Sequence, residues 1–125
     1  MPNLSDRLRI YHTNPSAPLP FDYLLDLTGP EIADHSDIVI VVPLLRQDQP
    51  GVSGFTKPAR HNRVLVPHRT LGMDQPYWVA VDNIQALPRQ VLGGYVSHLA
   101  EPYASLVNDL VKAWCGFDHF PQKVK

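Results

Sequence analysis

The stretch Ala100–Phe117, AEPYASLVNDLVKAWCGF, carries the clearest secondary-structure signal in the chain. Its apolar residues recur at offsets of three and four, the spacing that places side chains on one face of an α-helix. Those residues are Tyr103, Leu106, Val107, Leu110, Val111 and Trp114. Pro102 suits the first turn of a helix, where its missing N–H would have no partner, and Gly116 can supply the left-handed conformation that ends one. We therefore predict one amphipathic helix that packs its apolar face against the rest of the fold.

The chain before this helix favours short strands over further helices. Its 13 prolines interrupt long helices. The run Asp37–Leu45, DIVIVVPLL, is apolar on both faces, as expected of a central strand that is covered on both sides, and Pro43 should lie near its end. The strand candidates are Arg7–Thr13, Phe21–Leu27, Asp37–Leu45, Asn62–Pro67, Tyr77–Asp82 and, less regular, Ile84–Leu92. The pattern predicts a mainly β fold, a small antiparallel sheet or barrel, with one C-terminal helix.

Size and composition indicate a single soluble domain. The chain has 125 residues, 44% of them hydrophobic, and a net charge of -1, which argues against a dedicated nucleic-acid binder. The single cysteine, Cys115, excludes an intramolecular disulfide and fits a reducing compartment. The N-terminus MPNLSDRLRI lacks the apolar run of a signal peptide, and no apolar stretch is long enough to span a membrane. We predict a cytoplasmic location.

Side chains that carry chemistry are scattered along the sequence. No histidine pair has the helical spacing of metal ligands, and no glycine-rich phosphate loop is present, so we expect neither a metal nor a cofactor. One charge feature stands out, a cluster of cations with His61 and His68 interleaved: Lys57, Arg60, Arg63 and Arg69. This cluster could contact phosphate or an acidic peptide, or it could be an ordinary solvated loop and strand edge.

Several fragments, taken in order, resemble the CcdB family of toxins, whose wider superfamily also contains the MazF and Kid ribonucleases. The fragments are RIYHT from Arg9, YLLDL from Tyr23, VVPLL from Val41, and the ungapped run VDNIQALPRQVLGGYVSHLAEPYASLVNDLVKAWCGF from Val81 to Phe117. The resemblance therefore covers most of the chain between Arg9 and Phe117. No single fragment is specific, and their order and spacing together carry the likeness.

The resemblance implies an SH3-like barrel of antiparallel strands that forms a homodimer, with a toxin domain over residues 1–117 and a tail over residues 118–125. Such toxins of type II toxin-antitoxin systems bind the A subunit of DNA gyrase and trap the cleaved-DNA complex, and a CcdA-like antitoxin neutralises them. It further implies that the chain is not an enzyme and does not bind nucleic acid directly on its own. The implied gyrase contacts are Trp114, Cys115, Gly116, Phe117 and Ile32, and the cation cluster is a candidate antitoxin contact.

Two alternatives remain open. The first is a MazF-like endoribonuclease, in which Arg60 or Arg63 would bind the phosphate and Asp82 or His61 would transfer a proton. The second is a non-toxic relative that keeps the dimeric barrel as a binding module. It is suggested by Cys115, which stands where the CcdB family has a tryptophan, and by the added tail.

Overall fold

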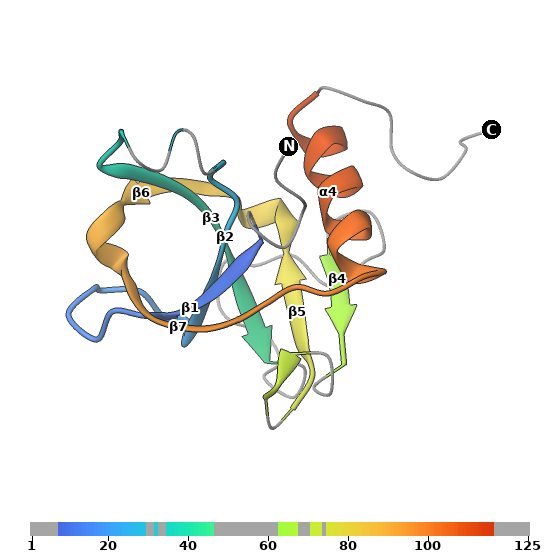
Figure 1. The fold of residues 1–125 in the computed structure, drawn as a ribbon, viewed down its shortest axis with the longest axis horizontal. Helices are drawn as coiled ribbons and strands as arrows, with labels where there is room; N and C mark the ends of the chain where they lie inside the picture. Colours follow the sequence, from blue (N-terminus) through green and yellow to red (C-terminus); the bar gives the residue numbers. More distant parts are fainter. Residues whose placement is uncertain are drawn as a thin grey trace.

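The computed structural model describes residues 8–29, 32, 35–46, 63–67, 71–73 and 75–116. These residues form β-strands, two short 3-10 turns and one α-helix, arranged as Figure 1 shows. In chain order they are β1 (Arg9–Thr13), β2 (Tyr23–Asp26), β3 (Ile38–Arg46), β4 (Arg63–Val66), β5 (Tyr77–Ala80), η1 (Val81–Asn83), β6 (Gln85–Pro88), η2 (Arg89–Val91), β7 (Leu92–His98) and α4 (Tyr103–Trp114). The predicted tail over residues 118–125 lies outside the described residues.

The strands pair antiparallel in the order β4-β5-β3-β2-β1-β7, and β6 pairs with β3 beside β5. The long strand β3 lies along β2 on one side, while on its other side Ile38–Val41 pair with β6 and Leu44–Arg46 pair with β5. Because η2 leads from β6 into β7, and β7 pairs with β1, the strands curl into the ring at the left of Figure 1. The predicted fold class, mainly antiparallel β with a barrel-like sheet and a C-terminal helix, is confirmed.

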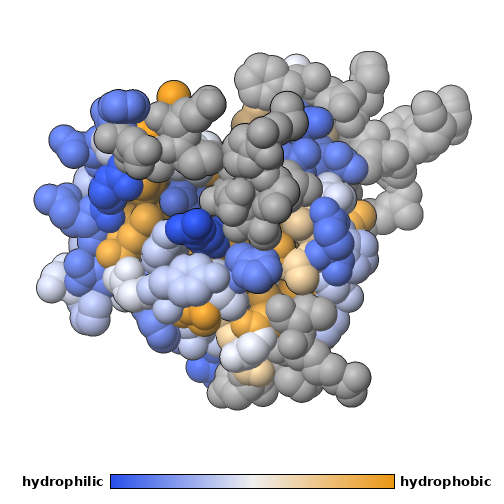
Figure 2. Space-filling view, in the orientation of Figure 1, coloured by the Kyte–Doolittle hydropathy of each residue, from blue (hydrophilic) through white to orange (hydrophobic). Residues whose placement is uncertain are grey.

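The sheet separates two apolar clusters because side chains alternate along its strands. On β2, Leu24 packs in a cluster with Val41, whereas Leu25 packs with Val42 in a second cluster that also contains Val107 and other residues of α4. Hydrophilic and apolar residues are interspersed on the face drawn in Figure 2. The alternation lets one sheet fill the ring on one face and hold the helix on the other.

Pro43 lies inside β3 rather than near its end, and the pairing explains why the strand tolerates it. A proline has no N–H to donate to a ladder. Pro43 faces Leu24 of β2, but among the described residues it has no pairing partner on the side shared by β6 and β5. The proline therefore falls where β3 changes partner.

Strand β7 has no counterpart among the predicted elements. The Gly93-Gly94 pair indicated the end of a segment, yet β7 runs through both glycines to His98. An added Cβ on Gly93 would lie 2.9 Å from the His12 carbonyl oxygen, so the glycine serves the close approach of β7 to β1 rather than a turn.

The helix begins at Tyr103, and Glu101 caps it. The Glu101 carboxylate accepts hydrogen bonds from the Ser105 N–H at 3.1 Å and the Ser105 hydroxyl at 2.9 Å. Gly116 has a φ of 80°, the left-handed conformation expected after the last turn. Within the described residues, no helix is long and apolar enough to cross a membrane.

Only some of the apolar side chains of α4 are buried against the sheet. Ala104, Val107 and Leu110 are buried, but Leu106 is 46% exposed and Trp114 is 42% exposed. The prediction that all six apolar residues pack on the sheet is therefore only partly right.

Leu110 and Leu106 offer a matched test of this packing on one helix. Leu110→Ala should destabilise the protein by about 2–5 kcal/mol, because it leaves a cavity between α4 and the sheet. Leu106→Ala, the control, should change the free energy of unfolding by less than about 0.5 kcal/mol. Urea unfolding followed by circular dichroism measures both. Equal losses for the two variants would contradict the packing of Leu110 between the helix and the sheet.

Candidate functional site

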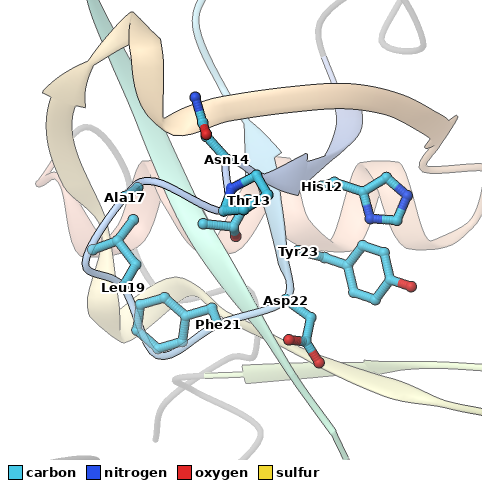
Figure 3. Close-up of a pocket in the computed structure, with 9 residues that line it drawn as sticks. His12, Thr13, Asn14, Ala17, Leu19, Phe21, Asp22 and Tyr23 are labelled. Carbon is cyan, nitrogen blue, oxygen red and sulfur yellow. The ribbon is translucent and has the colours of Figure 1, made fainter.

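A pocket of about 410 Å³ opens where β1 runs through its loop into β2 (Figure 3). It is lined by His12, Thr13, Asn14, Pro15, Ala17, Leu19, Phe21, Asp22 and Tyr23. Phe21 belongs to the inner cluster of the barrel, and Ala17 and Leu19 pack against that cluster. The pocket thus joins an apolar wall to a rim of polar side chains.

His12 and Tyr23 form one side of the rim. They are opposite each other in the β1–β2 ladder, and their ring centroids lie 5.1 Å apart. Tyr23 in turn meets the buried Tyr77 edge-to-face, with centroids 5.3 Å apart. The Tyr23 ring therefore contacts both the buried ring of Tyr77 and the exposed imidazole of His12, which it helps to hold in place.

The rim presents three kinds of groups that exchange protons or accept hydrogen bonds. They are the imidazole of His12, the phenol of Tyr23 and the exposed carboxylate of Asp22. Imidazole is the side chain best suited to accept and return a proton near neutral pH. Within the described ranges, no three His, Cys, Asp or Glu side chains gather closely enough to hold a metal ion. The arrangement is suited to proton transfer.

Asn14 fixes the loop that frames the pocket. Its side-chain Nδ2 donates to the Gln90 carbonyl at 2.8 Å, and its Oδ1 accepts from the Ser16 N–H at 3.0 Å. Its own N–H donates to the Val91 carbonyl at 2.8 Å. The bonds to Gln90 and Val91 tie the loop to η2, and the bond from Ser16 holds the loop itself, so the pocket has a preformed wall.

Thr13, another residue that lines the pocket, has a buried side-chain hydroxyl. Its N–H donates to the Asp22 carbonyl at 2.9 Å, which continues the ladder, but its buried Oγ1 has no hydrogen-bond partner among the described residues. A buried hydroxyl without a partner is costly to stability.

Arg63 and Asp82 come together, as the ribonuclease alternative requires, but inside the protein. Arg63 Nε lies 3.2 Å from Asp82 Oδ1, and the two side chains are only 4% and 9% exposed. This ion pair links β4 to η1 beneath the surface, where breaking either partner would be strongly destabilising. Neither side chain presents a surface to a phosphate in this structure.

The expected gyrase contacts lie partly on the surface. Trp114, Cys115 and Gly116 are exposed at the end of α4, and Ile32 is 61% exposed. Phe117 lies outside the described residues, as do four other residues of the expected sites, Lys57, Arg60, His61 and Arg69. The gyrase assignment stays a prediction.

Sequence reasoning missed the residues of the pocket. It found no histidine pair with the spacing of metal ligands and named none of the pocket residues as a functional candidate. The one available signal was that the strand candidates Arg7–Thr13 and Phe21–Leu27 follow each other across a short loop, which favours a hairpin. Such a hairpin brings His12 and Tyr23 together only in one register.

No protein-family model matches this sequence, and no curated protein matches it either. Solved structures share its fold. Mycobacterium tuberculosis toxin MazF-mt6 is 21% identical, with a TM-score of 0.67 over 88% of this chain and 98% of that one. An Mtb toxin is 22% identical, with a TM-score of 0.61 over 82% and 96%. An endoribonuclease from a mycobacterial species is 17% identical, with a TM-score of 0.61 over 94% and 93%.

One of these neighbours is named as a MazF toxin, and none of the three is named as a CcdB toxin. They also contradict the prediction that the chain is not an enzyme, because one structure that shares its fold over nearly its whole length is an endoribonuclease. At these identities the likeness establishes the fold alone.

Gly93 and Gly94 give a matched test of how the pocket is positioned. Gly93→Ala should lower the melting temperature by several degrees, because its Cβ would meet the His12 carbonyl oxygen at 2.9 Å and push β1 away from β7. Gly94→Ala, the control, should have little effect, because nothing lies within 4 Å of its Cβ. Differential scanning calorimetry compares them, and similar melting temperatures would contradict this role of Gly93.

Proposed function

We propose that this protein is the toxin of a toxin-antitoxin pair and that it cleaves single-stranded RNA at the pocket of His12, Thr13, Asp22 and Tyr23. The observation that carries the proposal is the pocket itself, where an exposed imidazole and a phenol meet at the rim. The fold shared with an endoribonuclease and a MazF toxin supports it. It replaces the expectation that the chain does not contact nucleic acid.

The proposed step is an internal transfer at one phosphodiester. His12 accepts the proton of the ribose 2′-hydroxyl, and the 2′-oxygen forms a bond to the adjacent phosphorus. The bond from phosphorus to the 5′-oxygen of the next nucleotide breaks, and the Tyr23 hydroxyl protonates that leaving oxygen. The products are a 2′,3′-cyclic phosphate and a free 5′-hydroxyl.

The proposal includes a homodimer and an antitoxin as partners. On the outer face of the ring, Ile38 and Ile40 are exposed directly opposite the exposed Pro88 and Ala86 of β6. Residues opposite each other in a ladder share a face, so the four make a continuous apolar strip. A second copy of the chain or an antitoxin segment would cover it.

The first test is cleavage of RNA by the purified protein. Single-stranded RNA should be cut to fragments ending in a cyclic phosphate, and His12→Ala should slow this about 10²–10⁴-fold, the usual contribution of a proton-transfer group. Gel electrophoresis of end-labelled RNA measures the rate.

Two variants sharpen this test. Tyr23→Phe keeps the ring contacts but removes the proposed acid, so it should also be slow. His35→Ala removes another exposed histidine outside the pocket and should cleave at the wild-type rate. Full activity in His12→Ala, or no cleavage by the wild type, would disprove the proposal.

A second candidate function is binding to DNA gyrase, at its A subunit, through the end of α4. Exposure of Trp114 beside Cys115 and Gly116 favours it, because exposed tryptophans often dominate the energy of protein interfaces. This surface is separate from the residues of the pocket, so the two functions can be tested independently.

Calorimetry with the dimerisation region of that gyrase polypeptide measures this second candidate. Trp114→Ala should weaken binding at least tenfold. Leu106→Ala, a similarly exposed apolar residue of the same helix, should bind as the wild type does. If the wild type releases or absorbs no heat and shows no complex by gel filtration, the gyrase candidate is wrong.

A further inference from the structure

A second cluster of RNA-compatible side chains lies on the ladder between β1 and β7. Arg9 is opposite His98, and Tyr11 is opposite Tyr95. Tyr95 is 56% exposed, Arg9 and His98 are exposed, and Tyr11 is half-buried. Strand β7 ends the pairing order of the described strands, so none of them covers its outer side. Two groups that bind phosphate thus adjoin two aromatic rings at an open edge.

The four side chains share one face of the ladder. Arg9 and Tyr11 are two residues apart on a strand that pairs with β2 in regular register, so they point the same way. His98 lies directly across from Arg9. The Tyr11 and Tyr95 rings meet edge-to-face, with centroids 6.0 Å apart and an interplanar angle of 76°. Tyr11 therefore steadies Tyr95 while part of the Tyr95 ring stays open to solvent.

Asp26, the acidic residue opposite Arg9 in the β1–β2 ladder, is buried rather than exposed on this face. Its carboxylate accepts the Thr28 N–H at 2.9 Å. Burial raises the pKa of Asp26, while the Thr28 hydrogen bonds and the charges of Arg89 and Arg9 oppose that rise. The exposed groups of the ladder are therefore the side chains of Arg9, His98 and Tyr95, with Tyr11 half-buried beside them.

We propose that this ladder is a binding subsite for single-stranded RNA, in which a base stacks on Tyr95 and a neighbouring phosphate contacts Arg9 and His98. Aromatic platforms beside basic side chains are the usual means of binding single strands without reading their sequence. The assignment rests on the proposed function. Tyr11 directly precedes the pocket residue His12 on β1, so their side chains point to opposite faces of the sheet, and the subsite and the imidazole are reached from different sides.

The experiment is fluorescence anisotropy with a labelled 2′-O-methyl RNA octamer, which cannot undergo the proposed cleavage. Tyr95→Ala should weaken binding about tenfold, within the range measured for loss of one stacked base. Tyr95→Phe should bind within twofold of the wild type, because it keeps the ring. Trp114→Ala, which removes another exposed aromatic residue, should bind as the wild type does. Melting temperatures should be equal across the set, since each residue is exposed.

Arg9→Gln tests the phosphate contact separately. It should lower the slope of log affinity against log salt by about 0.7, the value expected for one phosphate contact to a single strand. The subsite is disproved if Tyr95→Ala binds the octamer as the wild type does, or if Trp114→Ala weakens binding equally. Loss on Tyr95→Ala of binding to a protein partner rather than to RNA would also overturn it.

Failure of the subsite can be told from failure of the catalytic pocket. RNA cleavage that depends on His12, with octamer affinity unchanged in Tyr95→Ala, would remove the subsite and leave the proposed function. Tyr95-dependent binding without any cleavage of ordinary RNA would support the subsite and remove the catalytic proposal.

Discussion

The structure depends on β3 being shared by three other strands. Its nine residues pair with β2 along one side and with β6 and then β5 along the other. In its middle β3 is also covered on both faces, because Val41 and Val42 fill opposite clusters, whereas Ile38 and Ile40 near its start are exposed. The change of partner at Pro43 separates the ring from the part of the sheet that carries α4. A polar residue at either valine would break one cluster or the other.

Strand β1 carries residues of both the pocket and the ladder with β7. It pairs with β2 in regular register, but its pairing with β7 shifts twice, between Ile10 and Tyr11 and again between Tyr11 and Thr13. Irregularities of this kind re-aim side chains near functional sites. Gly93 permits them, because any larger residue would collide with the backbone of β1. The candidate pocket and the tyrosine ladder are therefore positioned by the same strand and the same close approach.

Local patterns were enough to predict the helix and most of the strands, because periodicity and β-branched runs report burial directly. They could not predict β7, since glycines mark turns and close approaches alike. Nor could they predict the pocket, because a register shift of one residue would separate His12 from Tyr23. The cationic residue Arg63 shows the same limit, since its charge suggested a surface role and the fold buries it against Asp82.

The burial of the Arg63–Asp82 ion pair affects which residues could bind the phosphates of an RNA. A guanidinium that is already desolvated and paired gains little from a phosphate, and it would lose its buried ion pair with Asp82 if it moved. In the proposed function, phosphate recognition would therefore fall to groups that remain solvated, such as Arg9 and His98 of the ladder. Proton transfer would fall to the rim where aromatic contacts hold the exposed imidazole of His12 in place. Sharing a fold with toxins does not decide between RNA cleavage and gyrase binding, because function depends on sites rather than on architecture. In this chain the pocket beside β1 and the tryptophan at the end of α4 are different surfaces, so each must be judged by its own side chains.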